Sequence, residues 1–83
     1  MRKVVFYGLS TCGWCRRTKQ FLDANGVQYE LTYVDLAKGT DKQQAMDQVK
    51  RWNPRLSFPT VIVDDATVVI GFDEESLRKA LDL

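Results

Sequence analysis

The chain has 83 residues, of which 45% are hydrophobic and 28% are charged, and its formal net charge is +1. This length is typical of one domain, and the composition is that of a chain that can bury a core rather than of a disordered one. A net charge so close to zero argues against a dedicated binder of nucleic acid or of a membrane surface. We therefore expect a single domain over residues 1–83, with neither nucleic acid nor a membrane as its partner.

The first residues contain a short apolar run, Val4 to Tyr7, which is too short for a signal-peptide core or a membrane span. We therefore expect a cytoplasmic protein. The chain has two cysteines, Cys12 and Cys15, and no histidine. In a reducing compartment a C-x-x-C pair is more often redox-active or metal-binding than a lasting disulfide.

The first half of the chain reads as strand, helix, strand. The β-branched and aromatic run Lys3–Tyr7 predicts a strand that is buried on both faces. Thr11 is a good N-cap residue, and it predicts a helix that runs to about Asn25 and stops at Gly26. A second strand follows over Tyr29–Val34. This βαβ order predicts that the two strands pair in parallel.

A polar connector then leads to a second helix. Thr40, with Gln43 three residues later, is a candidate capping box for this helix. The helix is expected to run to about Trp52 and to end at Asn53 and Pro54.

The last part of the chain predicts a hairpin and a helix. Thr60–Val63 and Thr67–Ile70 read as strands joined by a tight turn, which predicts an antiparallel pair. A final helix is expected over Phe72–Leu83.

The order β-α-β-α-β-β-α, with a C-x-x-C where the first strand meets the first helix, resembles the thioredoxin superfamily and most closely its glutaredoxin branch. Three motifs carry the resemblance over nearly the whole chain: "CGWC" at 12–15, "SFPT" at 57–60 and "GFDEE" at 71–75. The resemblance implies an α/β fold of the thioredoxin type, with a four-stranded mixed sheet and helices on both faces.

The position of Cys12 indicates a nucleophile. A cysteine in the first turn of a helix faces free backbone N–H groups and the positive end of the helix dipole, and both favour the thiolate. Arg16 lies one turn further along and can add positive potential. Thr11, as the expected N-cap, and Arg16 are therefore the candidate thiolate-stabilising residues.

Cys15 is expected on the same helical face, one turn deeper and within disulfide reach of Cys12. Cys12 would attack a substrate disulfide, and Cys15 would then attack Cys12 and release the reduced substrate. This pair predicts a thiol–disulfide oxidoreductase that reduces protein disulfides or glutathione mixed disulfides.

The cysteines have two other possible uses, a structural disulfide and a metal site. A disulfide closing so short a loop would stabilise the fold by roughly 2 kcal/mol, less than the about 3 kcal/mol of a fifteen-residue loop. A metal site needs about four ligands, and this chain offers two thiolates and no histidine. The remaining alternative is an iron–sulfur or zinc site that bridges two protomers. Some glutaredoxins hold a cluster in this way with "CGFS", whose glycine Gly13 matches and whose serine Cys15 does not.

The resemblance implies that Phe58–Pro59 is a cis peptide opposite the cysteines, where the Phe58 backbone can pair with a substrate peptide. From the residues alone, a trans proline that opens an edge strand stays open. The family usually has Thr-Val-Pro here, so the Phe58 side chain can instead lie in the core. Trp14 is either an exposed contact surface for a partner or packed over a neighbouring loop.

The source of electrons is open between glutathione and a reductase of the thioredoxin-reductase type. The family lysine that helps to hold glutathione is replaced by Leu9, whereas Arg55 matches a basic position of some members. Asp73 matches the acidic residue that meets the γ-glutamyl amine, or is a helix N-cap. The pair Gly71 and Phe72 resembles small redoxins that take electrons from a protein. We expect a monomer with no tightly bound cofactor, and glutathione at most as a co-substrate.

Overall fold

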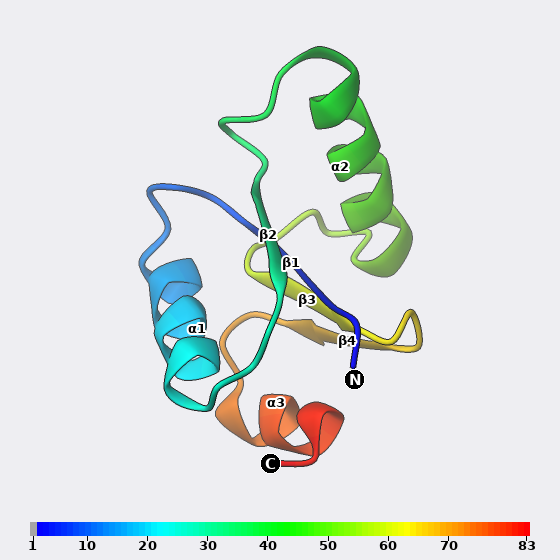
Figure 1. The fold of residues 1–83 in the computed structure, drawn as a ribbon. Helices are drawn as coiled ribbons and strands as arrows, with labels where there is room; N and C mark the ends of the chain where they lie inside the picture. Colours follow the sequence, from blue (N-terminus) through cyan, green and yellow to red (C-terminus); the bar gives the residue numbers. More distant parts are fainter. Residues whose placement is uncertain (1) are drawn as a thin grey trace.

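The computed structural model describes residues 2–83 as a four-stranded sheet with three helices (Figure 1). The elements confirm the predicted order: β1 (Val4–Gly8), α1 (Gly13–Ala24), β2 (Glu30–Tyr33), α2 (Gly39–Trp52), β3 (Thr60–Val63), β4 (Thr67–Ile70) and α3 (Glu74–Leu81). Within these residues, no helix is both long enough and apolar enough to cross a membrane.

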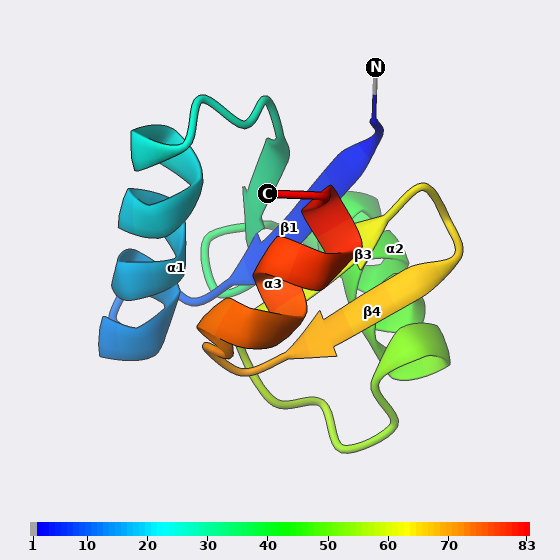
Figure 2. The same ribbon diagram turned by 90° about the horizontal axis from the view of Figure 1, so that it is seen from below.

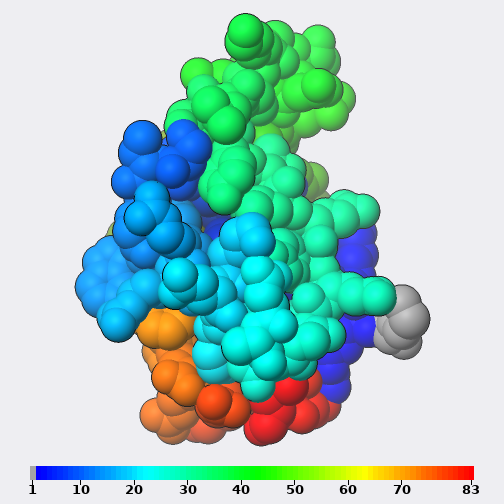
Figure 3. All heavy atoms as spheres, turned by 60° about the vertical axis from the view of Figure 1, so that its left-hand side comes forward, coloured from blue at the N-terminus to red at the C-terminus, as the bar shows by residue number. Residues whose placement is uncertain are grey.

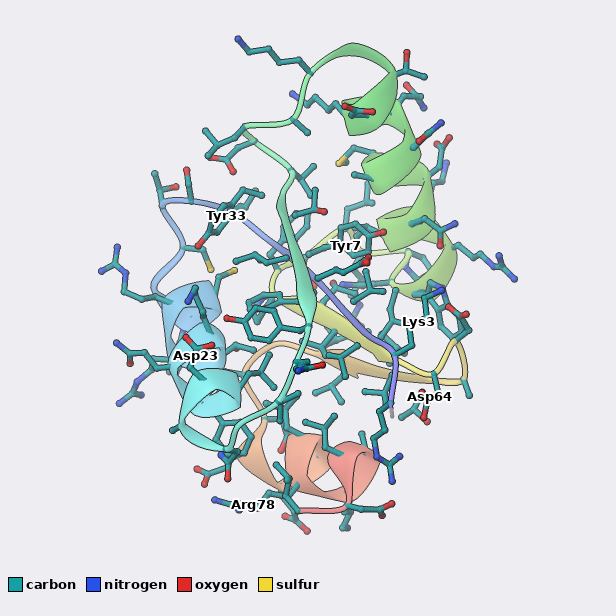
Figure 4. The ribbon with its side chains drawn as sticks, viewed as in Figure 1. Lys3, Tyr7, Asp23, Tyr33, Asp64 and Arg78 are labelled. Carbon is teal, nitrogen blue, oxygen red and sulfur yellow. The ribbon has the colours of Figure 1, made fainter. Side chains whose placement is uncertain are left out.

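The sheet has the strand order β2-β1-β3-β4 and is mixed. Strand β1 pairs in parallel with β2 and antiparallel with β3, and β3 and β4 form the predicted antiparallel hairpin. Asp64 and Asp65 make the hairpin turn, both with positive φ. The backbone N–H of Lys3 donates to Asp64 Oδ1 at 2.8 Å and ties the start of β1 to this turn (Figure 4).

The helices cover both faces of the sheet, with α1 and α3 on one face and α2 on the other (Figure 2). Side chains of β1 alternate between the two layers. Phe6 is fully buried with Leu22 of α1 and Leu77 of α3, whereas Tyr7 packs with Val49 of α2. The strand is therefore buried on both faces, as its continuous apolar sequence predicts.

Two predicted helix starts are wrong. The N-cap of α1 is Cys12 and not Thr11, because the Cys12 sulfur accepts the backbone N–H of Cys15. Helix α2 begins at Gly39, so Thr40 lies inside its first turn and forms no capping box. Gln43 instead donates from Nε2 to Asp47 Oδ1 at 3.0 Å.

The final helix is shorter than predicted. Asp73 is its N-cap, so Phe72 lies outside the helix. At the other end Asp82 adopts a left-handed conformation with φ 55°, which stops the helix after Leu81.

A buried polar network anchors the loop between α2 and β3. Asn53 Nδ2 donates to the carbonyl oxygen and the hydroxyl of Ser57 and to Thr60 Oγ1, each at 3.0 Å. The Thr60 hydroxyl donates to the Ser57 carbonyl at 2.8 Å. Asn53 and Thr60 are almost completely buried. The network therefore holds the residues on either side of Phe58–Pro59 in place.

We predict that Asn53→Ala lowers the free energy of unfolding by about 1–3 kcal/mol, because buried groups lose their hydrogen-bond partner. Urea denaturation of the purified protein measures this change. Gln43→Ala is the control, since it removes an exposed amide from helix α2 and should change the stability by less than about 0.5 kcal/mol. A similarly small effect of Asn53→Ala would contradict the structural role given to the network.

Candidate active site

The two cysteines lie where β1 passes into α1. The backbone N–H of Cys12 donates to the Leu9 carbonyl at 3.1 Å, which closes the turn after β1. Both cysteines are free thiols; Cys12 is partly accessible, whereas Cys15 is only 2% exposed. The sequence therefore predicted the relative depth of the two sulfurs correctly.

The cysteines contact each other directly. The backbone N–H of Cys15 lies 3.2 Å from Cys12 Sγ. Burial, and after it the hydrogen bond with Cys12, raise the pKa of the Cys15 thiol to about 12, although the backbone of Leu9 acts in the opposite direction. Cys15 is therefore a neutral thiol near pH 7.

A carboxylate fixes the loop before Cys12. Asp35, two residues after β2, accepts the backbone N–H of Ser10 at 3.0 Å through Oδ1 and the Ser10 hydroxyl through Oδ2. These bonds hold the pKa of Asp35 below its usual value. The sequence does not predict this contact, because a loop serine and a loop aspartate 25 positions apart carry no local signal that they meet.

Two further segments meet the start of α1. The Phe58–Pro59 peptide bond is cis, as the resemblance implied. The backbone N–H of Gly71 donates to the Pro59 carbonyl at 2.8 Å. The rings of Trp14 and Phe72 stack with centroids 6.3 Å apart and planes 19° from parallel. The start of α1, the loop before β3 and the turn after β4 therefore lie together, and Figure 3 shows the first and last of these side by side.

Trp14 is both packed on a neighbouring loop and exposed to solvent, which are the two alternatives that the sequence left open. Its side chain packs on Phe72 yet stays 57% exposed, and the guanidinium of Arg17 lies 5.6 Å from its ring centroid. No motif in the sequence predicts this role for Arg17. The Phe58 side chain is half-buried and packs against both hydrophobic clusters, so it lies largely in the core.

The charged candidate residues are exposed or hydrogen-bonded elsewhere. Arg16 and Arg55 are exposed, and within residues 2–83 no hydrogen bond joins the Arg16 guanidinium to the Cys12 sulfur. Asp73 caps α3: it accepts the Ser76 N–H at 3.1 Å and the Ser76 hydroxyl at 2.9 Å. The two bonds hold the pKa of Asp73 below its usual value.

Metal ligands are sparse around the thiols. Across residues 2–83, no group of three or more histidine, cysteine, aspartate or glutamate side chains is arranged to hold a metal ion. A bridging cluster would need ligands from a second molecule, and nothing in the geometry favours that alternative.

Comparison with known proteins gives a consistent result. The glutaredoxin family model matches residues 4–68. The crystal structure of Methanosarcina acetivorans methanoredoxin is 47% identical, with a TM-score of 0.93 over 98% of this chain and 85% of the other. A glutaredoxin structure from Archaeoglobus fulgidus is 34% identical, with a TM-score of 0.88 over 98% of this chain and 87% of the other.

A relative identified by its sequence is also a glutaredoxin. Glutaredoxin 1 of Rickettsia bellii is 30% identical over 66 residues, which are 78% of this chain and 65% of the relative. The family match extends from β1 into β4 and includes both cysteines and the loop before β3. The chain therefore belongs to the glutaredoxin family.

Proposed function

We propose that the protein is a thiol–disulfide oxidoreductase that reduces protein disulfides through Cys12 and Cys15. The observation that carries this proposal is the pairing of a partly accessible sulfur with a buried one at the start of α1. Cys12 is the attacking group, because substrate can reach it and because a backbone N–H directed at its sulfur suits a charged nucleophile. Cys15 is the resolving group.

The reaction consists of two exchanges. The Cys12 thiolate attacks one sulfur of the substrate disulfide; a Cys12–substrate disulfide forms, and the other substrate sulfur leaves as a thiolate and takes up a proton. Cys15 then gives up its proton and attacks Cys12 Sγ, which releases the second substrate thiol. The substrate gains two electrons, and the protein ends with a Cys12–Cys15 disulfide.

The surface around Cys12 suits an extended polypeptide. We propose that the Phe58 backbone and Pro59 bind the substrate main chain, while exposed Trp14 and its partner Phe72 contact substrate side chains. Gly71 supports this surface through its bond to Pro59. We also propose Arg55 and Asp73 as contacts with the substrate at the edge of this surface, although Asp73 already caps α3.

A protein reductant is the electron source that we favour over glutathione. Leu9 is partly buried against the cluster that contains Tyr7, and it brings no charge to the position where the family has a glutathione-binding lysine. We further propose that the protein works in the cytoplasm, since a dithiol of this kind must be re-reduced after each cycle. We also propose that it is a monomer without a tightly bound cofactor.

The two-exchange scheme predicts that Cys15→Ser accumulates a mixed disulfide with a protein substrate, because no thiol remains to resolve it. Non-reducing gels and mass spectrometry should find the adduct on Cys12. Cys12→Ser is the matched control and should form at least tenfold less adduct, since its remaining thiol is buried. Rapid turnover of protein disulfides by Cys15→Ser without added thiol would contradict the dithiol route.

The proposed preference for a protein reductant predicts that a lysine at position 9 increases the use of glutathione. A charge-assisted hydrogen bond contributes about 1.5–3 kcal/mol, so Leu9→Lys should raise glutathione-dependent disulfide reduction about ten- to a hundredfold at limiting glutathione. Activity with a thioredoxin-reductase-type protein should change little. The assay compares both reductants in parallel at a fixed substrate concentration.

Leu9→Met is the control, because it keeps an apolar side chain of similar volume and adds no charge. It should leave glutathione-dependent activity unchanged. Saturation of the unmodified protein at low glutathione, or no response to Leu9→Lys, would show that glutathione binds without this charge.

A further inference from the structure

Gly8, the last residue of β1, lies directly against Cys15. A Cβ atom at this position would be 3.3 Å from each of three atoms: Cys15 Cβ, Cys15 Sγ and Phe6 Cε1. These separations are shorter than ordinary van der Waals contacts between carbon and sulfur or carbon. The backbone of Gly8 is not left-handed, so a side chain here would be disfavoured by its neighbours, which would have to shift by a few tenths of an ångström, and not by its φ angle.

Cys15 has little freedom on its other sides. It is 2% exposed and belongs to the cluster formed by the sheet, α1 and α3, where close packing transmits any change in volume. In the resolving step its sulfur must move to within about 2.05 Å of Cys12 Sγ, in a narrow range of dihedral angles. A small displacement of Cys15 therefore hinders this step.

We propose that Gly8 is a positioning residue for the resolving step: the space left by its missing side chain is where the Cys15 thiol sits and from which it turns toward Cys12. This inference rests on the dithiol mechanism proposed above. The three atoms nearest to an added methyl group belong to Cys15 and Phe6 and none to Cys12. Gly8→Ala should therefore slow the second exchange and spare the first.

The reaction of the reduced protein with 5,5′-dithiobis(2-nitrobenzoate) separates the two steps. Attack by Cys12 releases one coloured thiolate and leaves a mixed disulfide; attack by Cys15 releases the second and forms the Cys12–Cys15 disulfide. We expect two rapid equivalents from the unmodified protein. In Gly8→Ala, the first phase should stay within about twofold and the second should slow at least tenfold.

Gly13→Ala is the matched control. It adds the same methyl group within the cysteine motif, but, apart from its chain neighbours and the nearby backbone of its own helix, no atom lies within 4 Å of the added carbon. Both phases should therefore match those of the unmodified protein. Equal slowing of both phases in Gly8→Ala, or none, would overturn the role of Gly8 while leaving the dithiol mechanism intact. Absence of the second phase in the unmodified protein would overturn the mechanism and, with it, this role.

A thermodynamic cycle covers the case in which Gly8→Ala does not fold. Replacing Cys15 with alanine removes the sulfur that the new methyl group would press against. Two of the three close contacts, with Cys15 Cβ and Phe6 Cε1, remain in Cys15→Ala, so we expect Gly8→Ala to lower the melting temperature in both backgrounds, but by less in Cys15→Ala. An equal loss in both backgrounds, or failure of the double variant to fold, would show that the methyl group does not act through the Cys15 sulfur and would overturn the inference.

Discussion

The contact between the Cys15 backbone N–H and the Cys12 sulfur is the interaction on which the site depends. It makes Cys12 the N-cap of α1, and so places one sulfur at the free end of the helix. The same helical turn carries the Cys15 side chain inward against the end of β1. One helix start therefore sets both the distance between the thiols and their difference in accessibility, which a two-step exchange requires.

The rest of the site is brought in by contacts between distant parts of the chain. The Asn53 network fixes the loop that contains Pro59, and the Gly71 N–H binds the Pro59 carbonyl. The Trp14–Phe72 stack joins the turn after β4 to α1. Asp35 holds the loop before Cys12 through Ser10. A small sheet thus places three loops around one sulfur at one end of its strands.

Much of this arrangement is readable from the sequence, because strands and helices follow from the spacing of apolar residues. The run before Gly8 predicts a central strand, and "CGWC" predicts the sulfur pair. The cis form of Pro59 was implied only by the resemblance to glutaredoxins, since the residues alone also allowed a trans proline. The helix start was misplaced because Thr11 is a better N-cap by residue type, whereas the sulfur of Cys12 performs that task. The Ser10–Asp35 contact, the Asn53 network and the close approach of Gly8 to Cys15 depend on tertiary packing, which no local pattern encodes.

Alkylation of the reduced protein with substoichiometric iodoacetamide, mapped by mass spectrometry from pH 6 to pH 9, tests the assignment of the two sulfurs most directly. The raised pKa of Cys15, about 12, and its burial predict that Cys12 carries nearly all of the label throughout this range. Earlier or equal labelling of Cys15 would contradict the account, since Cys15 would then be the accessible nucleophile.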